Sequence, residues 1–194
     1  MKLIDYHHHV IPEEVAELMP ELVKPDSVWN PKETVQFLKE NGIEGGVLSL
    51  YHPSLPVKNR QLWVKITRAF NEAAATAKQE NPDTLRAFAA IPFPYIEESL
   101  AEIEYALDEL RLDGVCIFPI SGETQLDEEV ALPILKELDK RHAIVFMHPV
   151  NAEGIPVDNE RYLDTVLSLS RFMYNDMLKH CQNIQFIFAH TGGI

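Results

Sequence analysis

Short and almost continuously apolar runs alternate along this chain with longer amphipathic segments. The runs are rich in Val, Ile, Leu and Phe, and their hydrophobicity does not alternate from one residue to the next. This is typical of parallel strands that are covered on both faces. The pattern therefore predicts six strands: Lys2 to Tyr6, Gly46 to Tyr51, Leu85 to Ile91, Gly114 to Ile120, Ala143 to Met147 and Ile184 to Ala189.

The segments between these runs have the marks of helices. Asn30 is a suitable N-cap for the first of them, and Pro31 stands at its first helical position. The predicted helices are Pro31 to Glu40, Asn59 to Glu80, Glu97 to Leu110, Asp127 to Lys140 and Asp164 to His180. A repeated strand-then-helix order predicts an α/β fold with a parallel sheet.

Such a sheet either stays open and doubly wound or closes into a barrel. The open nucleotide-binding form has a glycine-rich turn after its first strand, whereas here the first run leads into His7-His8-His9-Val10-Ile11-Pro12. This favours a TIM-type (β/α)8 barrel, which needs eight strands and about 250 residues. We therefore expect residues 1–194 to form a single barrel domain with about six β/α units, truncated at its C-terminal end.

The histidines fall at two kinds of position. His142 and His180 lie at the ends of predicted helices, where an imidazole suits the helix dipole, and we interpret both as structural. Five other histidines lie at the carboxyl ends of predicted strands, where barrels of this type place their functional residues. These are His7, His9, His52, His148 and His190.

Three of these histidines are predicted to bind a metal ion. His7 and His9 are two residues apart, so that on a strand both face the same side, while His8 faces the helices. His148 ends the fifth strand. Neutral imidazoles suit Zn²⁺ best, with Fe, Mn or Co as alternatives. The fourth strand has no Lys, Asp or Glu to bridge a second ion, so we predict one divalent metal ion, Zn²⁺ by preference.

The remaining residues of the predicted site have supporting roles. His190 follows the sixth strand and is the candidate catalytic residue, because a histidine beside a metal can hold or relay a proton. His52 follows the second strand and is either a substrate-binding residue or a polar residue of the rim. Asp5 either supports a ligand imidazole or satisfies backbone groups at the strand end.

Charge and composition narrow the choice of partners. The net charge of −13 argues against nucleic acid as a ligand, and no apolar run approaches the roughly 20 residues of a membrane helix. The first residues do not resemble a signal peptide, so we expect a cytoplasmic protein. Cys116 and Cys181 are predicted to be buried free thiols.

These motifs together resemble those of the amidohydrolase superfamily. The stretch from Ile4 to Pro12 is similar to the family's Asp-x-His-x-His opening, and specifically to the amidohydrolase-2 branch typified by aminocarboxymuconate semialdehyde decarboxylase. Val145 to Pro149 and Phe186 to Gly193 resemble that branch's His-Pro and His-Gly-Gly strand ends. The resemblance implies metal ligation by His7, His9 and His148, a metal-bound water held by His190, and a homodimer.

The sequence departs from the family pattern in two places. The family's Asp ligand at the end of the eighth strand has no counterpart here, and Val150 stands where the decarboxylase has Trp. The resemblance implies a metal-dependent hydrolase or a non-oxidative decarboxylase that uses a metal-activated water on a small carboxylate-bearing or cyclic substrate. The alternatives are a truncated, catalytically inactive barrel fragment, and a metal-dependent nuclease or phosphoesterase, which the charge of −13 disfavours.

Overall fold

The computed structural model describes residues 3–21, 23–50, 55–148, 166–167 and 169–190. Its main feature is one six-stranded sheet in the order β1-β2-β3-β4-β7-β8, in which every pair of neighbours is parallel. The strands are β1 (Ile4–Val10), β2 (Gly45–Leu50), β3 (Leu85–Ala90), β4 (Gly114–Ile117), β7 (Ile144–Met147) and β8 (Gln185–Phe188). The predicted parallel sheet of six strands is confirmed.

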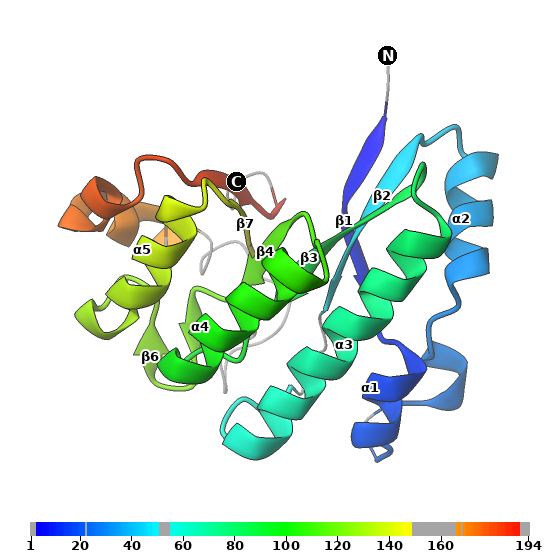
Figure 1. Ribbon diagram of the computed structural model, residues 1–194, viewed down its shortest axis with the longest axis horizontal. Coiled ribbons are helices and arrows are strands. Elements are labelled where there is room, and N and C mark those ends of the chain that lie inside the picture. Colours follow the sequence, from blue (N-terminus) through cyan, green and yellow to red (C-terminus); the bar gives the residue numbers. More distant parts are fainter. Residues whose placement is uncertain (1–2, 22, 51–54, 149–165, 168, 191–194) are drawn as a thin grey trace.

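Helices follow most of the strands and lie on one side of the sheet (Figure 1). A small antiparallel pair, β5 (Ile120–Ser121) and β6 (Thr124–Gln125), extends the loop after β4. Among the described residues no helix is both long enough and apolar enough to cross a bilayer. The helical elements are α1 (Glu13–Leu18), η1 (Pro25–Ser27), α2 (Pro31–Glu40), α3 (Arg60–Glu80), α4 (Ile96–Glu104), η2 (Tyr105–Glu109), η3 (Glu129–Ala131), α5 (Leu132–Lys140) and η4 (Asp176–His180).

The sheet is strongly curved. If it were flat, its two edge strands would lie about 24 Å apart, because neighbouring strands are spaced by about 4.8 Å. Instead the ring of His7 on β1 lies 5.0 Å from the ring of His190, which follows β8. Side chains that project from opposite edges of the sheet therefore meet across its concave face, as in a partly formed (β/α)8 barrel.

The two faces of the sheet bury different sets of side chains. The face toward the helices contributes to a large core with Trp63, Ile66 and Phe70 of α3, all of which are 1% exposed or less. The concave face carries a separate small cluster, which corresponds to a barrel interior. It consists of Val47, Phe88, Cys116, Phe146 and Ala189.

Both cysteines are buried free thiols, as predicted. Burial raises the pKa of the Cys116 thiol to about 12. Burial, with a smaller contribution from the negative charge of Asp139, raises the pKa of Cys181 to about 11. Both side chains are therefore protonated at neutral pH.

The helix signals in the sequence are reproduced at α2 and α3. The side chain of Asn30 accepts a hydrogen bond from the backbone N–H of Lys32, and α2 spans Pro31–Glu40 as predicted. Asn59 caps α3 in the same way, through the N–H of Leu62. The helix predicted over residues 164–180 falls partly outside the described residues, and its described part includes helical residues 166–167 and 169–174 before η4.

Three predicted boundaries were wrong. The first strand continues through the histidines to Val10, because its pairing with β2 extends to Leu50. The helix predicted over residues 97–110 ends as the π-helical turn η2, where the N–H of Leu110 bonds to the carbonyl of Tyr105. Residues 127–140 begin with the 3-10 turn η3 instead of a continuous α-helix.

Gly114 is a position where a side chain does not fit. A Cβ atom built there would lie 2.5 Å from the carbonyl oxygen of Ile144 and 3.0 Å from the Phe88 ring. We expect Gly114→Ala to lower the free energy of unfolding by about 2–3 kcal/mol, because the β4–β7 backbones must separate. Urea denaturation measures this loss.

Gly42→Asn is the matched control for this substitution. Gly42 has a φ of +66° and nothing within 4 Å of an added Cβ, and asparagine tolerates this left-handed conformation. The control should change the free energy of unfolding by less than about 1 kcal/mol. Equal losses in the two variants would contradict the close approach at Gly114.

Candidate metal centre

Three histidine nitrogens form a nearly equilateral triangle at the mouth of the curved sheet. The Nε2 atom of His7 lies 2.9 Å from that of His9, and the Nε2 of His148 lies 3.0 Å from each of them. His7 and His9 project from β1, and His148 directly follows β7. Residues separated by about 140 positions thus present the same ring atom to one point.

This spacing is the one expected of ligands around a common cation. In a neutral imidazole Nε2 either carries a hydrogen and donates or has a lone pair and accepts. Among three Nε2 atoms at least two are therefore alike, so at least one side of the triangle cannot be a hydrogen bond. Two nitrogens that lie about 2.1 Å from one ion, at a right angle, are about 3.0 Å apart. The three residues therefore fit a divalent ion held by three lone pairs.

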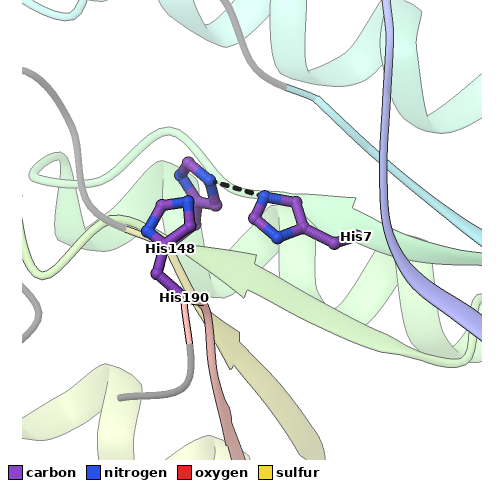
Figure 2. A group of neighbouring side chains, drawn as sticks. All are labelled: His7, His148 and His190. Atoms are coloured by element: carbon purple, nitrogen blue, oxygen red, sulfur yellow. Dashed lines mark hydrogen bonds between the residues drawn. The ribbon is translucent and has the colours of Figure 1, made fainter. Parts of the chain in front are cut away.

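His190 lies beside this triangle. Its ring is 5.0 Å from that of His7 and 5.1 Å from that of His148, and the ligand atoms of these three residues all lie within 4.8 Å of one another. Figure 2 shows the three side chains directed toward one another, with the contact between His7 and His148 dashed. His190 has a φ of 52°, a left-handed conformation that is uncommon for residues other than glycine.

Aromatic rings form the floor of the centre. Phe146 of the concave cluster lies 5.5 Å from the His7 ring and 5.8 Å from the His148 ring. Phe118 lies 6.5 Å from His148, which is only 2% exposed. This apolar floor lowers the local dielectric, which strengthens electrostatic interactions at the histidines.

Ser49 is a residue of the site that the sequence analysis missed. Its Oγ lies 2.9 Å from Nδ1 of His9, and this contact orients the ring so that Nε2 faces the other two histidines. Ser49 is the polar residue within the apolar run Val47-Leu48-Ser49-Leu50, and it is fully buried. A hydroxyl at such a position was a signal that could have identified it.

The other histidines and Asp5 take the following places. His142 follows α5 with a φ of 50°, and His180 ends η4, so both lie at helix ends as predicted. Asp5 contacts the His7 backbone N–H and the ring of His8, which corresponds to the second of its two predicted roles. The predicted substrate-binding residue His52 lies outside the described residues.

Comparison with known proteins identifies the family of the chain. The family model for amidohydrolases matches residues 4–194. The chain belongs to the amidohydrolase family. The predicted family resemblance is thus confirmed, and so is the barrel-type fold.

Three similar proteins illustrate the range of the family. The chain is 28% identical to the 6-methylsalicylic acid decarboxylase of Aspergillus aculeatus over 98% of its own length and 63% of that protein. It is 26% identical to the 2-amino-3-carboxymuconate-6-semialdehyde decarboxylase of Dictyostelium discoideum, over 85% and 48%. A dihydroxybenzoic acid decarboxylase of Polaromonas, solved with bound manganese, superposes with a TM-score of 0.81 at 19% identity, over 100% and 67%.

The chain thus spans between about half and two thirds of the length of these curated relatives. The family and the fold follow from the comparisons.

Proposed function

We propose that His7, His9 and His148 bind one divalent metal ion, and that the protein catalyses the non-oxidative decarboxylation of a small carboxylic acid. The observation that carries the metal proposal is the Nε2 triangle, with sides of 2.9, 3.0 and 3.0 Å. The right-angled spacing fits a five- or six-coordinate ion, so Mn²⁺ and Zn²⁺ are the ions to test.

The relatives support decarboxylation over hydrolysis. Those compared above are named for the removal of a carboxylate from an aromatic or unsaturated acid. An ortho-hydroxybenzoate or a similar flat acid is therefore the proposed substrate class. The homodimer and the cytoplasmic location expected from the sequence stay predictions.

The residues of the centre have distinct roles in this proposal. A bound divalent ion supplies a positive charge that attracts and polarises the substrate's oxygens. Loss of CO₂ replaces a carbon–carbon bond by a carbon–hydrogen bond, so one proton must reach the carbon atom. His190 faces the same point as the metal-binding histidines and is the group proposed to hold that proton. Phe146, whose ring lies 5.5 Å from that of His7, is the apolar group proposed to keep water from this side of the centre.

The test measures metal content and CO₂ release on the same preparations. We expect about one divalent ion per chain in the wild type, and loss of that ion in the His7→Ala/His9→Ala variant. We also expect the metal-loaded wild type to release CO₂ from 6-methylsalicylic acid or from a dihydroxybenzoic acid. Elemental analysis and a CO₂ assay provide the two readings.

His180→Ala is the control, because His180 is exposed and lies at the end of η4, away from the triangle. It should keep both the ion and the activity of the wild type. A folded wild-type chain that takes up neither Mn²⁺ nor Zn²⁺ would contradict the metal centre. Metal uptake with hydrolysis of an ester or amide, and no CO₂ from any acid tested, would contradict decarboxylation.

A further inference from the structure

The first strand contains a bulge between Asp5 and His8, which includes the proposed metal ligand His7. Asp5 pairs with Gly46 of β2, but the next paired residue of β1 is His8, which lies opposite Leu48. Three steps along β1 thus match two steps along β2, so β1 holds one extra residue. Bulges are rare between parallel strands, and they re-aim side chains near functional sites.

Asp5 satisfies the backbone at this bulge. Its Oδ1 accepts a hydrogen bond from the N–H of His7 at 3.0 Å, and its Oδ2 lies 2.9 Å from Nδ1 of His8. In a regular strand residues 5 and 8 would point to opposite faces, because side chains alternate. The extra residue places both on the helix side, while His7 and His9 point to the concave side.

The contacts of His8 continue into the neighbouring helix. Nε2 of His8 lies 3.2 Å from Oγ1 of Thr34 on α2. The indole N–H of Trp29 donates to the same oxygen at 2.8 Å, and the Trp29 backbone N–H bonds to the carbonyl of Ile11. Thr34 is only 5% exposed, so its hydroxyl group depends on these partners.

The donors and acceptors along this path are mutually consistent. The Asp5 carboxylate accepts from Nδ1–H of His8, which leaves Nε2 as an acceptor for the Thr34 hydroxyl group. That hydroxyl group in turn accepts from Trp29, which can only donate. A continuous chain of hydrogen bonds therefore connects α2 to the backbone of His7.

We propose that His8 and Thr34 are positioning residues for the metal centre: through Asp5 they fix the bulge that aims His7 at His9 and His148. This inference rests on the proposed metal binding. It goes beyond direct metal ligation, because the hydrogen bonds of His8 and Thr34 lead to Asp5, Trp29 and each other and not to the Nε2 triangle. Their effect passes through the backbone of His7.

The test compares two substitutions of Thr34 that differ in the hydroxyl group. Thr34→Val keeps the branched shape and removes the hydroxyl, whereas Thr34→Ser keeps the hydroxyl and removes the methyl group. We expect Thr34→Val to weaken Co²⁺ or Mn²⁺ binding by about 10–100-fold, as the loss of outer contacts to metal ligands does elsewhere. Thr34→Ser should stay within about threefold of the wild type. Calorimetric titration of the folded, metal-free chain gives the dissociation constants.

A second substitution keeps the inference testable if Thr34→Val folds poorly. His8→Phe keeps a ring and removes both nitrogens, so it breaks the path at its centre. It should weaken metal binding at least as much as Thr34→Val. The double variant should bind no more weakly than His8→Phe alone, because both changes interrupt one path. The Co²⁺ absorption spectrum should shift in the same variants, reporting an altered ligand arrangement.

The outcomes separate the two proposals. If the wild type binds metal and Thr34→Val binds it equally well, the positioning role is wrong while the metal centre stands. Equal weakening in Thr34→Val and Thr34→Ser, with additive effects in the double variant, would assign these residues to general packing and overturn the inference. A wild type that binds neither ion overturns the metal centre and this inference together.

Discussion

Replacing His148 by alanine is expected to weaken divalent metal binding by more than 100-fold, an estimate that exceeds the loss seen when only outer contacts are removed. His148 is 2% exposed and supplies one of the three Nε2 atoms of the triangle. Its loss leaves two imidazoles from a single strand. Two ligands that lie two residues apart hold an ion far less well than three from two strands, because less of the ion's hydration is replaced.

The measurement is the dissociation constant for Mn²⁺ and Zn²⁺ on metal-free protein. His148→Leu serves as a second variant, since it fills the space of the ring and separates the loss of a ligand from the loss of packing. His180→Ala is the matched control and should bind as the wild type does. A His148→Leu variant that retains wild-type affinity would show that the ion is held elsewhere.

Asn71→Ala is expected to produce the largest loss of stability among the substitutions considered. The fully buried Asn71 side chain accepts a hydrogen bond from the N–H of Ala90 and donates one to its carbonyl oxygen, both at 2.8 Å. It thus replaces a neighbouring strand at the end of β3. It also donates to Glu102 at 2.7 Å. Removal leaves buried backbone groups unpaired, at about 1–3 kcal/mol each, so we expect a loss of about 3–4 kcal/mol.

Urea denaturation of the metal-free chain measures this effect. Thr76→Ala is the control, because Thr76 lies on the same helix, is exposed, and bonds only to the carbonyl of Glu72 among the described residues. It should change the free energy of unfolding by less than about 0.5 kcal/mol. A loss below 1 kcal/mol for Asn71→Ala would show that water or a shifted backbone can replace the amide.

The sequence predicted the strands and the group of histidines at their carboxyl ends well, because both leave a clear local pattern. Buried parallel strands are continuous in hydrophobicity, so their number and order could be predicted before any coordinates. Histidines after or within such strands had to meet at one end of the sheet, since parallel strands share one carboxyl edge. His7, His9, His148 and His190 do lie together there, although their roles stay predictions.

Other features depend on contacts between residues that are far apart in the sequence, and a local pattern does not reveal such contacts. The bulge of β1 arises from its register with β2, and nothing within residues 4–10 specifies that register. The bond between His8 and Thr34 joins residues 26 positions apart, and that between Ser49 and His9 joins residues 40 apart. The π-helical turn of η2 was also missed, because Leu100, Ile103 and Leu107 have the spacing of an ordinary α-helix.

The burial of Cys116 has a consequence for the choice of a probe metal. This thiol belongs to the same concave cluster as Phe146, whose ring lies 5.5 Å from that of His7. A soft ion such as Cd²⁺ can displace the proton of any thiol within its reach, whatever the pKa of the metal-free group. Cadmium therefore tests how far the ion lies from this cluster: a ¹¹³Cd chemical shift in the range of nitrogen ligation means that only imidazoles bind it, and a shift toward the range of sulfur ligation means that Cys116 has joined them.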